Sequence, residues 1–148
     1  MQIVLKDNPL ENAKHVYVTI EQIRVHRADP GKFIVVHDNT REFDLLRLKR
    51  HPHVVVDMRV KAGHYNQIRL CIVSGRIVID ENGTDVTYEM KIPSNEIKIP
   101  VQLKLEENGR TEVVLDFDAE KSIQFHKKGK KNSYTLRPVI KVEKIKNS

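Results

Sequence analysis

The sequence predicts an all-β protein: a single antiparallel β-sandwich of the prealbumin or immunoglobulin-like type, spanning residues 1–148. We expect about eight to ten short strands and at most one or two helical turns. Three observations support this prediction. Apolar and polar residues alternate along most of the chain, while helical spacing is almost absent. The apolar residues are mostly Val, Ile and Leu, which favours strands, and turn-forming residues separate the alternating segments.

The first long strand changes phase within the segment. Apolar residues occupy even positions up to Ile20 and odd positions from Ile23 onward. Such a switch is typical of a β-bulge, which we expect near Glu21-Gln22. Asp29-Pro30-Gly31 then predicts a turn before a strand over residues 33–36.

The apolar patch over residues 43–48 is too short for periodicity to decide between a short strand and one helical turn. A strand is expected from Val54 to Val60, after His51-Pro52-His53. It meets a turn at Gly63, since glycine takes the positive φ that a tight turn requires.

The strand after Gly63 is expected to be long and largely buried, with a bend or bulge at Ser74-Gly75. Strict alternation places its side chains on two faces. One face carries Ile68, Leu70 and Ile72, and the other carries Tyr65, Cys71 and Val73.

Two Asn-Gly pairs, at residues 82–83 and 108–109, predict β-hairpins in the second half of the chain. Between them, residues 97–105 alternate cleanly and include Pro100 and several lysines, which is typical of a guarded edge strand. Asp118 can cap one helical turn over residues 119–121. A last strand over residues 134–142 is expected to end in a frayed tail, residues 143–148.

The charge balance favours a mixed-charge surface over a nucleic-acid site. The chain carries 26 basic and 20 acidic residues, a net charge of +6, and both signs are spread along it.

Cys71 is the only cysteine, so no internal disulfide forms, and we expect it to pack as a small hydrophobe. No apolar stretch approaches the roughly 18 residues of a membrane span. The first residues lack the pattern of a signal peptide, which leaves a cytoplasmic protein or one that follows a removed leader.

Arg69 and Arg137 each stand within a mostly apolar segment, where an unpaired arginine is unusual. One interpretation is a clamp for an anion or a carboxylate. The other, which we favour, is a salt bridge on the sheet face with Asp44, Asp57 or Asp116.

Asp116 and Asp118 point the same way on a predicted strand and are candidates for a Ca²⁺ site. We favour a cap role for Asp118 and an ion pair for Asp116, with Arg69 or Arg137 as candidate partners, because no loop here has the spacing of a calcium loop. We therefore expect no metal or cofactor.

Two further patterns are weaker. His51 and His53 are two candidate metal ligands, but no spacing supplies the others that zinc requires, and a surface loop is favoured. Residues 127–131 form the densest basic run, which we interpret as a solvated hairpin tip. Stacking residues usually accompany a nucleic-acid site, and the nearby Phe125 and Tyr134 are expected to be core.

Seven blocks, in this order and spacing, resemble the bacterial and archaeal domain-of-unknown-function family DUF4382. The blocks are residues 5–9, 16–20 with 25–26, 43–48, 62–70, 92–98, 115–122 and 136–142, and the fourth reads Ala-Gly-His-Tyr-Asn-Gln-Ile-Arg-Leu. The resemblance covers nearly the whole chain. It implies a β-sandwich usually found in exported proteins, often lipoproteins, and no catalytic residue can be transferred from it.

No phosphate-binding glycine loop and no nucleophile elbow occur in the sequence, so we expect a non-enzymatic protein. The leading hypothesis is a binding, adhesion or assembly module of the cell envelope or the extracellular space. Its expected partner is a protein or a glycan at the cell surface, with membrane attachment only through a lipid anchor. The alternatives are a small-ligand or cation binder and, less favoured, a basic nucleic-acid-binding protein.

Overall fold

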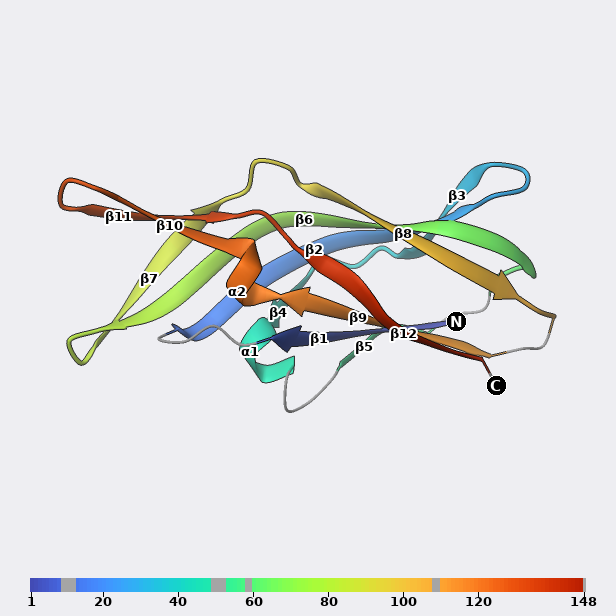
Figure 1. The fold of residues 1–148 in the computed structure, drawn as a ribbon, viewed down its shortest axis with the longest axis horizontal. Helices are drawn as coiled ribbons and strands as arrows, with labels where there is room; N and C mark the ends of the chain where they lie inside the picture. Colours follow the sequence, from blue (N-terminus) through green and yellow to red (C-terminus); the bar gives the residue numbers. More distant parts are fainter. Residues whose placement is uncertain (9–12, 49–52, 58–59, 108–109, 148) are drawn as a thin grey trace.

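The computed structural model describes residues 1–8, 13–48, 53–57, 60–107 and 110–147 as two β-sheets that face each other across one core (Figure 1). Two single-turn helices, α1 (Leu45–Leu48) and α2 (Ala119–Ser122), accompany the strands. The strands are β1 (Gln2–Asn8), β2 (Ala13–Arg27), β3 (Lys32–His37), β4 (Arg41–Asp44), β5 (His53–Asp57), β6 (Gly63–Glu81), β7 (Thr84–Lys91), β8 (Glu96–Leu105), β9 (Thr111–Asp118), β10 (Ile123–Lys128), β11 (Lys131–Leu136) and β12 (Ile140–Asn147).

The larger sheet has eight strands and is built on a central pair, β2 and β6, which run antiparallel over almost their full length. On the edge away from β2, the first half of β6 pairs with β8 and its second half pairs with β7. On the edge away from β6, the first half of β2 pairs with β4 and its second half pairs with β3. From β7 the sheet continues through β11 to β10. Two long strands therefore carry shorter partners on both sides.

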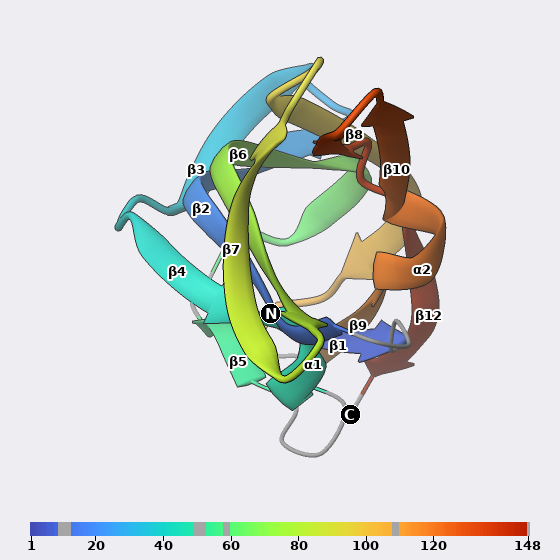
Figure 2. The same cartoon turned by 90° about the vertical axis from the view of Figure 1, so that its left-hand side faces the viewer.

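The smaller sheet has four strands in the order β12-β9-β1-β5. Most pairings in the described residues are antiparallel, but β1 pairs with β9 in parallel, and so does β7 with β11. Neither of these pairs is joined by a hairpin, because the two strands lie far apart in sequence. The predicted all-β sandwich is confirmed, and Figure 2 shows the two sheets on opposite sides of the core.

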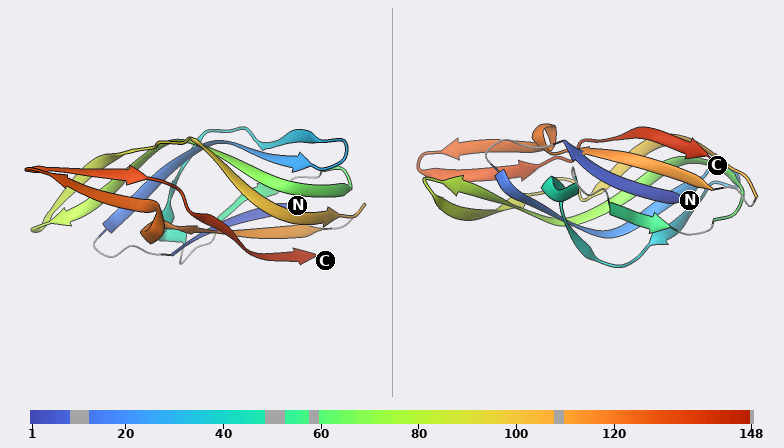
Figure 3. Two further views of the ribbon diagram at one scale, coloured as in Figure 1. Left: turned by 45° about the horizontal axis from the view of Figure 1, so that its top comes forward. Right: turned by 90° about the horizontal axis from the view of Figure 1, so that it is seen from below.

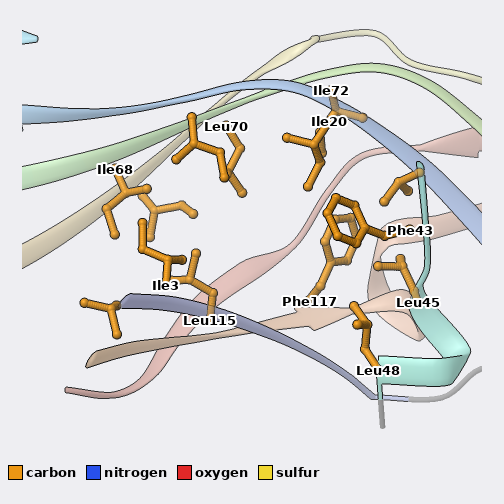
Figure 4. Close-up of a cluster of buried hydrophobic side chains, with 14 of the residues drawn as sticks. Ile3, Ile20, Phe43, Leu45, Leu48, Ile68, Leu70, Ile72, Leu115 and Phe117 are labelled. Carbon is orange, nitrogen blue, oxygen red and sulfur yellow. The ribbon is translucent and has the colours of Figure 1, made fainter. Parts of the chain in front are cut away.

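The core lies between the sheets (Figure 4). Ile20, Leu70 and Ile72 from β2 and β6 face Leu115 and Phe117 from β9. All five side chains are fully buried, and burial of this kind is the main force that holds the two sheets together. Phe43, Leu45 and Leu48 extend the cluster from β4 and α1.

The bulge expected near Glu21-Gln22 is present, since the register between β2 and β6 shifts between Ile20 and Gln22. As a result Ile20 and Ile23 both reach the core despite their opposite parity. A second shift skips Val73, next to the bend expected at Ser74-Gly75. Gly75 itself is buried, and a Cβ there would lie 3.0 Å from Met90 Cε.

The expectation that Tyr65 lies on the other face of the strand from Ile68 is wrong, because both side chains are fully buried in the core. The register between β6 and β8 shifts between Tyr65 and Gln67, which returns Tyr65 to the core face. The tyrosine hydroxyl donates to the Lys61 carbonyl oxygen at 2.7 Å. Val73 is indeed on the outer face and is 43% exposed.

Residues 43–48 contain both alternatives in succession, because β4 ends at Asp44 and α1 begins at Leu45. The Asn82-Gly83 hairpin is confirmed, with φ of 54° and 85° at the two residues. Asn108-Gly109 lies outside the described residues. The expectation that residues 143–148 form a frayed tail is wrong up to Asn147, because β12 continues to that residue and stays paired with β9.

The two ends of the molecule's long axis differ (Figures 1 and 3). The β6–β7 and β10–β11 hairpins form one end, while both chain termini and the β2–β3 hairpin lie toward the other. Within the described residues, neither helix has the length and apolar character of a membrane-crossing segment.

Candidate functional site

The outward face of the eight-stranded sheet, the side turned away from the smaller sheet, carries an unusual set of polar side chains. Arg24 lies between buried Ile23 and Val25 on β2, and Arg69 lies between buried Ile68 and Leu70 on β6. Because neighbouring residues of a strand point to opposite faces, both arginines are directed outward. The alternation that builds the core thus also places two cations on the open face.

Cross-strand register brings these cations into one row. Arg24 pairs with Arg69, and Arg69 pairs on its other side with Lys98 of β8. We call Arg24, Arg69 and Lys98 the basic row. Like charges directly opposite one another in a sheet are destabilising, so such a row requires a compensating group.

Glu96 is that compensating group. Its Oε1 accepts a hydrogen bond from Arg24 Nη2 at 2.9 Å and another from Arg69 Nη1 at 2.9 Å. Arg69 Nε also donates to Gln67 Oε1 at 2.8 Å. One carboxylate is therefore shared by two guanidinium groups, and the cluster keeps an excess of positive charge.

Phe33 of β3 packs against the same two arginines. The guanidinium carbon of Arg69 lies 4.1 Å from the centre of the Phe33 ring, and that of Arg24 lies 5.6 Å from it. Both distances are within the range of cation–π attraction. The side chains of Arg24 and Arg69 are 29% and 23% exposed, so their heads are ordered but still reach solvent.

An open hollow of about 300 Å³ lies beside this cluster. Its lining combines one aromatic ring with hydrogen-bonding side chains: His26, Phe33, Asn66, Gln67 and Arg69. His26 Nδ1 lies 2.7 Å from Asn66 Oδ1, and its ring centre lies 4.6 Å from that of Phe33. We call the hollow and the basic row together the arginine hollow.

A further arginine on the same face, Arg76, has a different environment. It makes two hydrogen bonds to Glu42, at 2.9 and 3.2 Å, and lies over the Tyr17 ring at 4.3 Å. The hydrogen bonds to Glu42 raise the pKa of Arg76. Its cross-strand neighbour on β7 is Glu89, so this cluster has no excess of positive charge.

Cys71 lies on the outward face next to Glu96 in the β6–β8 register. Its Sγ lies 3.7 Å from Glu21 Oε2. Burial, followed by the Glu21 carboxylate, raises the pKa of the thiol. The raised pKa favours the protonated thiol, and the group is partly exposed rather than buried as a core hydrophobe.

Of the two arginines predicted from sequence, only Arg69 lies in the arginine hollow. Its ion-pair partner is Glu96, and two of the expected aspartates have other partners: Asp44 binds His15 at 2.8 Å, and Asp116 lies 3.9 Å from Lys141 Nζ. The side chain of Asp57 lies outside the described part of the structure. Arg137 is exposed beyond the end of β11, and its backbone N–H donates to the Ser122 carbonyl oxygen.

The predicted cap is confirmed. Asp118 is the N-cap of α2, and its side chain accepts a hydrogen bond from the Lys121 backbone N–H at 3.1 Å. Within the described residues, no group of three or more His, Cys, Asp or Glu side chains is placed to hold a metal ion. His51 lies outside those residues, and His53 begins β5.

The basic run over residues 127–131 forms the tip of the β10–β11 hairpin, as expected, and Gly129 has a φ of 66°. Tyr134 is buried, but the expectation that Phe125 is core is wrong, since its side chain is 53% exposed. The hairpin extends beyond the smaller sheet (Figure 1), and the Phe125 ring packs against that of Tyr134, with 5.2 Å between the ring centres.

Sequence reasoning did not single out Arg24, Phe33 or Glu96. The signal for Arg24 was its alternation with Ile23 and Val25, the same pattern that identified Arg69. Glu96 and Phe33 lie on strands whose partners are fixed only by the fold, so no local pattern associates them with the arginines.

Neither the curated proteins nor the solved structures contain a match to the chain. Residues 1–138 match the family described as Domain of unknown function (DUF4382). That match covers nearly all of both sheets, and the chain belongs to this family.

Proposed function

We propose that the protein is a non-enzymatic binding module of the cell envelope or the extracellular space, and that it binds an acidic partner through the arginine hollow. The observation that carries the proposal is the shared Glu96: two arginines that face each other across β2 and β6 have one carboxylate between them. The remaining positive charge lies beside an open hollow.

Several features support binding at this face. A surface that only solubilises the protein has little need to place two guanidinium groups side by side, because the arrangement costs electrostatic energy. Guanidinium groups that are partly buried against an aromatic ring lose little entropy when they bind an anion. The Arg76–Glu42 pair, elsewhere on the same face, is the balanced arrangement expected for purely structural salt bridges.

The proposal assigns no catalytic role to this site. Cys71, a thiol on the same face, has a raised pKa that opposes thiolate formation. An envelope or extracellular location is what the family resemblance implies.

The experiment is a sedimentation assay with isolated cell-envelope material from the source organism, using the wild-type chain and two single variants. Arg69→Gln removes one cation from the basic row, and Arg76→Gln is the matched control on the same face. We expect wild type and Arg76→Gln to sediment with the envelope and Arg69→Gln to lose most of its binding.

Equal sedimentation of all three proteins, or none by wild type, would contradict binding through the arginine hollow. Fractionation of native cells tests the location separately. Recovery of the protein in the cytosolic fraction alone would overturn the proposed envelope or extracellular site of action.

A further inference from the structure

We infer that the arginine hollow binds a small hydroxylated carboxylate of the sugar-acid class, with the carboxylate held by Arg24 and Arg69 in the manner of Glu96. This inference rests on the proposed function and names the chemical group that the acidic partner presents. It concerns one site on the outward face, beside Phe33.

The charge of the site is the first argument. Arg24, Arg69 and Lys98 form the basic row across three strands, and Glu96 is the acidic side chain that bridges two of them. The four groups carry more positive than negative charge, and the excess lies at a partly desolvated position where Coulomb attraction is stronger than in bulk water. An anionic group is therefore the complementary ligand.

The geometry shows how a carboxylate fits. Glu96 Oε1 lies 2.9 Å from a terminal nitrogen of each arginine, which is a normal distance for charge-assisted hydrogen bonds. A guanidinium has five N–H donors, and the hydrogen bonds found among the described residues use Nη2 of Arg24 and Nη1 and Nε of Arg69. The pair retains donors for a second carboxylate beside Glu96, or for one that replaces it.

The rest of the lining suits hydroxyl groups. Asn66 and Gln67 each present an amide, and His26 presents an imidazole whose Nδ1 already contacts Asn66. Amides both donate and accept, so they match the mixed donor and acceptor character of sugar hydroxyls. The volume of about 300 Å³ is at the lower end of small-molecule pockets, which fits a single sugar unit or the end of a chain.

A phosphate is a poorer match. Phosphate sites are commonly built from backbone N–H groups at a helix N-terminus or a glycine-rich turn. The hollow lies on the pleated face of a sheet, where the paired residues of β3, β2, β6 and β8 use their backbone N–H groups in the ladders. The guanidinium groups of Arg24 and Arg69 already hold a carboxylate there.

The test is a titration of the ¹⁵N-labelled chain, followed by NMR, with glucuronate as the probe. Glucose is the matched neutral sugar, and inorganic phosphate is the competing oxyanion. We expect weak, saturable binding of glucuronate, with a Kd on the order of 1 mM for so open a site. Shifts should be confined to residues around Phe33, Asn66 and Arg69, with none from glucose.

Three variants make the assignment specific. Arg69→Gln should weaken glucuronate binding at least tenfold, while Arg76→Gln, on the same face, should leave it unchanged. Glu96→Gln removes the internal competitor and should tighten binding several-fold. This last variant keeps the inference falsifiable even if Arg69→Gln proves to be poorly folded, because a gain of affinity cannot arise from unfolding.

Equal binding of glucose, stronger binding of phosphate at the same residues, or no saturable shift with glucuronate would each overturn the inference. So would a Glu96→Gln variant with unchanged or weaker affinity. If envelope binding depends on Arg69 but glucuronate does not bind, the proposed function stands and the ligand class is wrong. If glucuronate binds but envelope material does not, the ligand class stands and the proposed function is wrong.

Discussion

Arg24 and Arg69 face each other in the β2–β6 ladder and donate to the same oxygen of Glu96. The arrangement places two like charges directly opposite each other and compensates them from a third strand, β8. Glu96 is therefore coupled to the stability of the sheet as well as to the charge of the hollow. This coupling gives the first prediction.

Glu96→Gln should destabilise the fold by about 1 kcal/mol at low salt, because it leaves two opposed arginines without a shared anion. Glu42→Gln is the matched control, since Glu42 compensates the single cation of Arg76 and should cost less. Urea unfolding at two salt concentrations measures both. Added salt should reduce the difference, as it screens the repulsion between partly exposed arginines. Equal costs for the two variants at low salt would argue against electrostatic strain in the basic row.

Gly63→Ala should destabilise the fold by about 2 kcal/mol or more, as expected for a side chain in a glycine-only backbone region. Gly63 has a φ of +152°, and a Cβ there would lie 2.8 Å from Arg27 Nε. To make room, the Arg27 head would have to shift from the position in which its Nη2 donates to the Ala62 carbonyl oxygen at 2.9 Å.

Gly129→Ala is the control for the backbone conformation alone. Gly129 has a φ of +66°, and a Cβ there would meet no heavy atom within 4 Å, so its cost should be about 1 kcal/mol. Thermal or chemical unfolding of both variants gives the comparison. A Gly63→Ala variant as stable as Gly129→Ala would mean that the contact with Arg27 is easily relieved.

Ser122→Ala should cost about 1–3 kcal/mol, because it leaves a partly buried backbone N–H without its acceptor. Ser122 is fully buried at the end of α2, where its Oγ accepts from the Val139 N–H at 2.8 Å and donates to the Asp118 carbonyl oxygen. Ser133→Ala, at an exposed hydrogen bond of 3.3 Å, should change stability by less than about 0.5 kcal/mol. Chemical unfolding measures the two costs, and hydrogen exchange at Val139 should accelerate only in Ser122→Ala.

Stability should fall as the pH rises above about 10, the ordinary pKa of tyrosine. Burial raises the pKa of Tyr65 and Tyr134, and the hydrogen bond to Glu81 raises that of Tyr88. The unfolded chain therefore releases these protons first, binds fewer protons than the folded chain in that range, and is favoured as the pH increases. Below this range the contribution is fully present.

Unfolding free energies measured across this pH range, with tyrosinate absorbance as a parallel signal, test the prediction. Tyr65→Phe removes one of the titrating groups, so its stability should decline less steeply with pH. It should also lose about 1 kcal/mol at neutral pH with the hydrogen bond to Lys61. A decline as steep as that of wild type would show that Tyr65 does not contribute.

Local patterns predicted most of the strands, the hairpin at Asn82-Gly83, the bulge near Glu21 and the cap at Asp118. These features depend on the conformational preferences of a few consecutive residues, which can be recognised without knowledge of the rest of the fold. The single strand expected over residues 134–142 is wrong, since β11 ends at Leu136 and β12 begins at Ile140. The same reasoning misplaced Tyr65, because one register shift after it reverses which side of the strand faces the core. It also placed Phe125 in the core, although only the reach of the β10–β11 hairpin decides what covers that ring.

The sequence by itself determined that this chain is an all-β sandwich and that Arg69 projects from a buried strand, since alternation and turn chemistry are local. Only the tertiary structure decided what Arg69 contacts. Arg24 comes from β2, Phe33 from β3 and Glu96 from β8, and their positions depend on strand order and register. Strand pairing is set by burial of the whole core rather than by the residues of the site. The favoured salt bridge of Arg69 is therefore made with Glu96 instead of an aspartate, and its fellow arginine is Arg24 instead of Arg137. Glu96 is 72 residues from Arg24 along the chain.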